Sequence, residues 1–206
     1  MRRARRRGVS GQTMVEFAMV APLFLLLVLA TIDFGGYFAS RLGVEEAARA
    51  GARAASVQVL STYSGTPITT AISAQRGLSA LTTTTDCIWN GTTLDTASYP
   101  PFTISGTSAS CVGIWYFDLR NEATGPPTLC TQWSVETAHP GFGSWNSSGT
   151  TWTAMATPPS GCVVPGEDLV VVGVGYKYTP MTPMPTIVST ALTTYAETQL
   201  IEEGVS

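Results

Sequence analysis

Basic residues are scarce in most of this 206-residue chain. Only Arg76, Arg120 and Lys177 lie beyond position 53, although the whole chain has eleven Lys and Arg residues against fourteen Asp and Glu. Binding to the phosphates of a nucleic acid requires a basic face. The scarcity of basic residues therefore argues against nucleic acid as a partner.

Residues for metal and nucleophile chemistry are also scarce. His139 is the single histidine, and the four cysteines form no CxxC pair. Zinc sites are recognised by closely spaced Cys and His ligands, which this chain lacks. It also has no GxSxG or comparable nucleophile motif. We expect a protein that is not an enzyme and that holds no metal or cofactor.

A long uncharged segment begins at Phe17 and runs to Ile32, and only Asp33 interrupts the apolar character before Ala39. A membrane-spanning helix needs about 20 such residues, so residues 17–39 are predicted to span a membrane once. Five arginines lie within the first seven residues. The positive-inside rule then places the N-terminus in the cytoplasm and the rest of the chain outside a bacterial inner membrane.

The predicted topology gives the cysteines a role. Outside the cytoplasm thiols tend to oxidise, so we expect two disulfides, each stabilising the fold by about 3 kcal/mol. The sequence leaves all three pairings open. The candidates are Cys87, Cys111, Cys130 and Cys162.

The residues before the apolar segment predict how the chain is processed. A secretory signal would carry a small-x-small site after the apolar run, and ATIDFGGYFAS is a poor match. The stretch from Gly11 to Phe17 instead resembles the cleavage site of type IV prepilins. That resemblance implies a prepilin peptidase that cuts between Gly11 and Gln12, removes residues 1–11 and leaves the apolar helix in the mature protein.

Glu16 is the one carboxylate at the start of this apolar helix. A charge near the hydrocarbon costs several kcal/mol unless it is paired. The α-amine of Gln12, freed by the cut, could pair with Glu16, and in a filament it could come from a neighbouring subunit. Alternatively, Glu16 reaches the cytoplasmic headgroups and favours the helix N-terminus. We favour pairing, because Gly11 precedes it and Phe17 follows it as in prepilins.

A wider set of motifs is similar to the TadE family of minor pilins or pseudopilins of tight adherence (Flp-type) pilus systems. In order these are GQ at Gly11, VEFA, a proline before a leucine-rich run, Asp-Phe-Gly from Asp33, and an alanine-rich AARAGAR segment. Residues 170–185, with a terminal helix that contains Glu197, resemble the family's C-terminal part less specifically. Residues 82–162 have no recognisable counterpart.

This resemblance implies a minor pilin or pseudopilin that acts by helix-mediated assembly. Its expected partners are the inner membrane, a prepilin peptidase, other pilin or pseudopilin subunits and the Tad secretion machinery. The alternative is a membrane-anchored, adhesin-like surface domain that binds through Trp-rich loops and never polymerises.

The helix is expected to continue beyond the membrane, over residues 12–60 in total. Asp33, about 25 Å from Glu16 along the helix, should reach the outer headgroup region, where we favour a solvated acid over an intersubunit salt bridge with Arg41 or Arg49. A stripe of small residues follows, and it suits close packing against either a partner helix or the protein's own outer domain. Its members are Ala47, Ala50, Gly51, Ala54 and Ala55.

Residues 61–206 predict a small extracytoplasmic domain, and the fold class is α+β. A short helix is expected over residues 68–81, then a Trp- and Cys-rich insert of short strands and loops over residues 82–162. The tryptophans are expected in the core more than on a binding face. Residues 169–178 alternate as a two-faced strand whose Gly173 and Gly175 indicate a bulge or a close neighbour. Residues 187–203 read as an amphipathic C-terminal helix.

Overall fold

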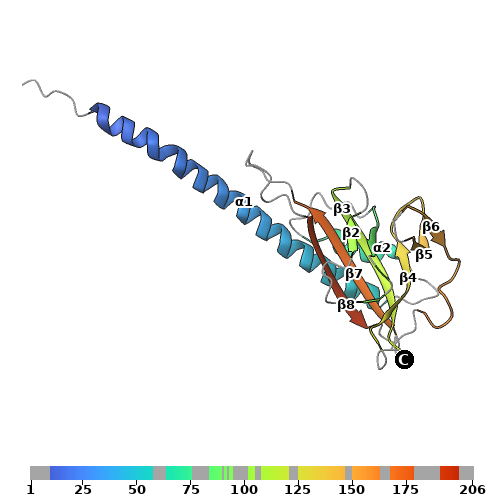
Figure 1. Ribbon diagram of the computed structural model, residues 1–206. Helices are drawn as coiled ribbons and strands as arrows, with labels where there is room; N and C mark the ends of the chain where they lie inside the picture. The colour runs from blue at the N-terminus through green and yellow to red at the C-terminus, as the bar shows by residue number, and fades with distance from the viewer. Residues whose placement is uncertain are drawn as a thin grey trace, which may run out of the picture.

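The computed structural model describes residues 10–57, 64–75, 84–89, 91, 93–94, 102–104, 108–120, 125–146, 150–162, 168–178 and 191–199. For residues 10–12 and 191–199 it describes the backbone alone. The chain forms a long helix, α1 (Ser10–Ser56), and a small head built on a β-sheet (Figure 1). The α+β class, with a long apolar N-terminal helix and a disulfide-containing domain, is confirmed.

Helix α1 is continuous over 47 residues, or about 70 Å, and it runs through Pro22 without a break. Its sequence favours this because its commonest residues are Ala and Leu, which are strong helix formers. Arg53 in the last turn complements the negative end of the helix dipole. The helix ends at Ser56, and the predicted extension over residues 58–60 lies outside the described residues.

The head contains a six-stranded antiparallel sheet in the order β6-β5-β4-β3-β7-β8. A separate two-stranded sheet pairs β1 with β2. The short helix α2 (Gly65–Ser73) begins earlier than predicted, at the cap Ser64, and residues 76–81 of the predicted helix lie outside the described residues. The strands are β1 (Cys87–Trp89), β2 (Phe102–Ile104), β3 (Ser110–Asp118), β4 (Thr128–Ser134), β5 (Gly141–Trp145), β6 (Trp152–Ala154), β7 (Asp168–Lys177) and β8 (Ala191–Gln199).

Strand β7, which the alternating pattern predicted, has two buried faces. Val172 lies in the core that includes α1 and α2, whereas Val171 lies in a second core with the aromatic residues of β1, β2 and β3. A Cβ on Gly173 would lie 2.6 Å from the Trp115 ring and 2.8 Å from Phe102. The predicted close neighbour of this glycine is therefore the Trp115 ring.

Two disulfides join parts of the head, as expected, and the structure selects one of the three pairings. Cys87 in β1 bonds to Cys111 in β3, and Cys130 in β4 bonds to Cys162. The first bridge ties the two-stranded sheet to the six-stranded sheet and is fully buried. Each bridge closes a loop of intermediate length and should stabilise the head by about 3 kcal/mol.

The expectation of core tryptophans is confirmed for two of the five. Trp89 and Trp115 are buried and meet edge to face, with ring centroids 4.9 Å apart. Trp133, Trp145 and Trp152 are only half-buried. The aromatic residues of the head therefore both fill the core and reach the surface.

The predicted C-terminal helix over residues 187–203 is wrong where the structure describes this segment. Residues Ala191–Gln199 form β8 and pair along β7 from Lys177↔Ala191 to Leu169↔Gln199. The segment ALTTYAETQ is rich in threonine, which favours strands. Pairing with β7 also gives the backbone groups of both strands partners that an unpaired edge would lack.

Candidate functional site

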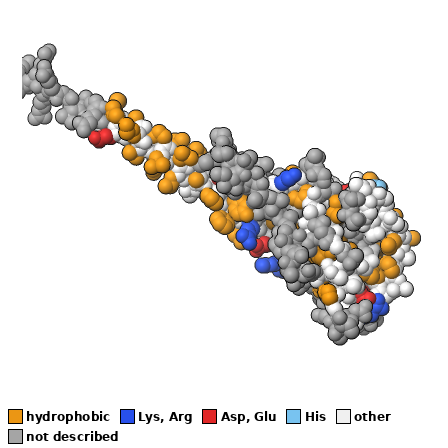
Figure 2. Space-filling view, in the orientation of Figure 1, with side chains coloured by type: hydrophobic (Ala, Val, Ile, Leu, Met, Phe, Trp, Pro, Cys, Tyr) orange, Lys and Arg blue, Asp and Glu red, His pale blue; other side chains and the backbone are white. Residues whose placement is uncertain are grey.

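The N-terminal half of α1 is an apolar rod with almost no cover from the rest of the chain. Every residue from Thr13 to Ile32 is exposed except Ala21, Leu29 and Ala30, which are half-buried. Phe17 is 71 % exposed and Phe24 67 % exposed. Figure 2 shows hydrophobic side chains along the part of α1 that projects from the head. By length and composition, this helix is capable of crossing a membrane.

The predicted cleavage and pairing residues all lie at the start of this rod. Gly11 and Gln12 belong to the first turn of α1, which begins at Ser10. Residues 1–9 of the predicted leader lie outside the described residues. Glu16 is exposed, one turn further along the same helix. The structure thus brings Gly11, Gln12, Glu16 and Phe17 together within two helical turns.

Within the described residues, the head meets α1 at a junction built around Tyr178, which lies just after β7. The Tyr178 hydroxyl donates a hydrogen bond of 3.0 Å to the backbone oxygen of Asp33. The Tyr178 ring meets Tyr37 edge to face, with centroids 5.8 Å apart. A Cβ on Gly36 would lie 2.7 Å from the Tyr178 hydroxyl oxygen, so a glycine here lets the phenol reach the helix backbone.

Burial raises the pKa of the Tyr178 phenol, and the negative charge of Asp33 adds to the effect. The phenol therefore keeps its proton at neutral pH and remains a hydrogen-bond donor. The contact between Tyr178 and Gly36 was not predicted from the sequence. The available signal was the Gly35-Gly36 step inside a helical pattern, because glycine within a helix often marks close packing.

Asp33 is not the solvated boundary acid that the sequence predicted. It is only 4 % exposed, because the head reaches back along α1 to this turn. On the other side of the helix, Phe34 and Phe38 remain about half exposed. The uncovered segment before Asp33, residues 13–32, is about 30 Å long, which equals the usual thickness of a bilayer's hydrocarbon core.

The C-terminal half of α1 carries small residues where it packs on the head. Ala47, Ala48 and Ala55 are fully buried in the core shared with α2 and β7. A Cβ on Gly51 would lie 2.8 Å from Val172 and 2.9 Å from Ile72. Of the two uses predicted for the small-residue stripe, the structure shows packing against the protein's own head.

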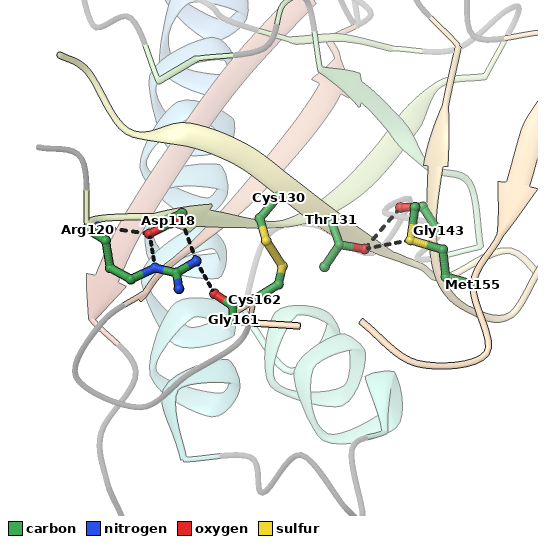
Figure 3. Close-up of a disulfide and its surroundings, with 8 residues drawn as sticks. All are labelled: Asp118, Arg120, Cys130, Thr131, Gly143, Met155, Gly161 and Cys162. Carbon is green, nitrogen blue, oxygen red and sulfur yellow. Dashed lines mark hydrogen bonds and ion pairs between the residues drawn. A yellow bond between two sulfur atoms is a disulfide. The ribbon is translucent and has the colours of Figure 1, made fainter. Parts of the chain in front are cut away.

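Cys130 holds a loop against the sheet. The register of β4 against β3 shifts between Tyr116 and Phe117, which leaves Cys130 as the extra residue of a bulge. Figure 3 shows the bond from Cys130 to Cys162 and, beside it, Arg120. The Arg120 guanidinium donates to the Gly161 carbonyl at 2.7 Å and to both oxygens of Asp118 at 2.9 and 2.6 Å.

These hydrogen bonds from Arg120 to Asp118, through the guanidinium and the backbone N–H, lower the pKa of the carboxyl. The ion pair and the disulfide therefore fasten the same loop to the same end of the sheet.

Asp86 is a buried carboxylate in the head. Its carboxylate accepts hydrogen bonds from the Val135 backbone at 2.8 Å and from the Trp145 indole at 3.0 Å. Burial raises the pKa of Asp86 despite these bonds. His139 lies against Trp145, with ring centroids 5.8 Å apart. Within the described ranges, no group of three or more His, Cys, Asp or Glu side chains could hold a metal ion.

Comparison with known proteins concerns the helix alone. Neither the curated proteins nor the solved structures give a match to the chain. A family model described as TadE-like protein matches residues 11–53, which is well under half of the chain and falls within α1. The weaker resemblance proposed for residues 170–185 is not part of this match. Over residues 11–53 the chain is similar to the TadE-like protein family, as its motifs predicted.

Proposed function

We propose that this protein is a minor pilin or pseudopilin of a tight adherence pilus or secretion system, and that it acts by assembly and not by catalysis. The similarity of residues 11–53 to the TadE-like family associates the chain with Tad pili. The observation that carries the proposal is the division of α1. About 30 Å of apolar helix is uncovered, and the rest is packed under a disulfide-bonded head.

The proposed cycle begins with the subunit in the inner membrane, its N-terminus in the cytoplasm and its head outside. Residues 1–11 are removed by a prepilin peptidase, which converts Gln12 into the new N-terminus. Cleavage removes five arginines from the cytoplasmic side and supplies an α-amine. The uncovered rod then moves from lipid into contact with the helices of other subunits.

Glu16 is the proposed pairing group in that assembly. It lies four residues after Gln12, at the start of a rod that has no other charge before Asp33. A carboxylate that leaves the headgroup region needs a positive partner, because an unpaired charge in an apolar surrounding costs several kcal/mol. The α-amine of Gln12, on the same or a neighbouring subunit, has the right charge.

The first test determines the N-terminus of the protein purified from membranes by mass spectrometry. We expect it to start at Gln12 and to start at residue 1 in a Gly11→Val variant. Gly8→Val is the matched control within the leader, and cleavage should survive it. A wild-type protein that begins at residue 1 would contradict the processing and favour the non-polymerising surface domain.

The second test separates insertion from assembly. Glu16→Gln keeps the size of the side chain and removes its charge, so we expect normal membrane insertion with loss of pilus assembly. Glu46→Gln is the matched control, because Glu46 is an exposed acid on the same helix beside the head. Normal piliation in the Glu16 variant would count against the pairing role.

A further inference from the structure

A groove in the head lies away from α1, between the two-stranded sheet and the outer strands of the large sheet. Its volume is about 290 Å³, and its lining includes Trp89, Leu129, Gln132, Ser144 and Trp145. Ligand pockets in proteins begin at about 300 Å³, so this groove suits one or two small rings. The β1 and β2 strands cover β3 and β7 and leave this part of β4 and β5 open.

Gln132 is the polar group that marks the groove as a built site. It is only 4 % exposed, and its side-chain amide makes no hydrogen bond to any residue that the structure describes. Gln132 is one of the residues that line the groove. A buried amide is costly to leave unpaired, and a ligand could supply a hydrogen-bond partner for it.

Two tryptophans line the same space in positions that the fold holds firmly. Trp89 is 5 % exposed, and its indole N–H donates to the Thr93 carbonyl at 3.3 Å. Trp145 donates to Asp86 at 3.0 Å. Both indole N–H groups are therefore occupied. The two rings thus contribute apolar surface, while Gln132 contributes an amide donor and acceptor.

The charge of the groove narrows the class of ligand. None of the described residues that line it is Lys, Arg, Asp or Glu. An anionic or cationic ligand would find no opposite charge there. A neutral ligand with an apolar face and several hydroxyl or amide groups would match tryptophan rings beside a single buried amide.

We propose that this groove binds a neutral saccharide, with a sugar ring against the tryptophans and its hydroxyl or acetamido groups hydrogen-bonded to Gln132. A site of this kind would let the head recognise a carbohydrate surface. The inference goes beyond assembly and does not depend on it, because it concerns the head alone. Failure of the test below would leave the N-terminal result unchanged.

The test uses the full chain in micelles of an amine-oxide detergent, because sugar-based detergents would compete for the groove. Glucose, cellobiose and N-acetylglucosamine are titrated while the tryptophan indole N–H resonances are followed by NMR, with Trp145 assigned from a Trp145→Phe variant. We expect saturable shifts of the Trp145 resonance with a Kd of about 1 mM for at least one of these sugars. Glucose 6-phosphate should bind no more tightly than glucose.

Gln132→Leu should weaken binding about tenfold, and Gln132→Asn should have an intermediate effect. Gln75→Leu is the matched control, because Gln75 lies at the end of α2 away from the groove. Near-UV circular dichroism verifies that each variant is folded. The proposal is overturned if no sugar shifts the Trp145 resonance up to about 50 mM, if only the phosphorylated sugar binds, or if folded Gln132→Leu and Gln132→Asn bind like the wild type.

Discussion

The two halves of α1 are both apolar, yet they differ in the size of their side chains. Before Asp33 the helix presents large residues such as Phe24 and Leu26, and these remain exposed. After Asp33 its inner face is mostly alanine and glycine, and this face is buried against the head. Small side chains let a helix approach a sheet closely, whereas large ones suit a fluid surrounding such as lipid. Side-chain size, more than hydrophobicity, separates the packing half from the free half.

The strongest test of this comparison places the same large residue on the buried face of α1 and at an exposed position of the same helix. Gly51→Leu should destabilise the head by about 3 kcal/mol or more, because even a Cβ there would lie 2.8 Å from Val172. Gly35→Leu is the matched control, since a Cβ at Gly35 has no atom within 4 Å, and it should stabilise the helix by up to about 1 kcal/mol. Thermal unfolding followed by circular dichroism compares them. Equal melting temperatures for the two variants would contradict the role given to side-chain size.

The head's stability should depend on its disulfides, whereas that of the free half should not. Replacing Cys87 and Cys111 together by alanine should lower the free energy of unfolding by about 3 kcal/mol. Under mild reduction, Cys130–Cys162 should open first, because Cys130 is half-buried whereas Cys87 and Cys111 are fully buried. Differential alkylation with mass spectrometry reads the order. Two free thiols in the untreated protein would contradict the pairing.

The boundary between the halves depends on Tyr178. Tyr178→Phe removes the hydrogen bond to the Asp33 carbonyl but keeps the ring, so it should cost about 1 kcal/mol. Hydrogen exchange should then rise in the last residues of β7 and little in β3. Tyr176→Phe, two residues earlier in β7, is the control and should change less. An unaltered exchange pattern in the Tyr178 variant would show that the junction does not depend on this bond.

The smallest expected effect is on the pH dependence of the unfolding free energy, through Asp118 and the loop held beside it. Its pKa is lowered in the folded protein, so its contribution to stability is present above the ordinary value of 3.8 and is lost as the pH falls through the folded pKa. Unfolding free energies measured between about pH 6 and pH 2 should therefore decline with a small component that Asp118→Asn lacks. Identical pH profiles for the two proteins would exclude this contribution.

Local sequence patterns predicted the features that depend on neighbouring residues. The uncharged run from Phe17 to Ile32 indicated α1, and the alternation around Val171 and Val172 indicated β7. The predicted helix over residues 187–203 was wrong where β8 forms. Short apolar spacings fit both a helix and a strand, and the partner strand determined which one formed. Propensity was overridden by the backbone pairing that β7 offers.

Contacts between distant residues could not be predicted. Tyr178 bonds to Asp33 across 145 positions of sequence, so the burial of Asp33 followed from the tertiary structure alone. The groove likewise joins Trp89 of β1 to Gln132 of β4, and only the sheet order brings these strands together. The pairing of the four cysteines also depends on the tertiary structure, so it could not be predicted from the sequence either.

Lipid contact along α1 tests the division of the helix most directly. A photoreactive benzoylphenylalanine would replace Phe24 in the free half of α1 in one variant and Val57, just after the end of the helix, in another, since both side chains are exposed, at 67 % and 49 %. After illumination in native membranes, we expect lipid adducts at position 24 and none at position 57. Adducts at both positions, or at neither, would contradict a helix whose free half lies in the membrane and whose other half lies beside the head.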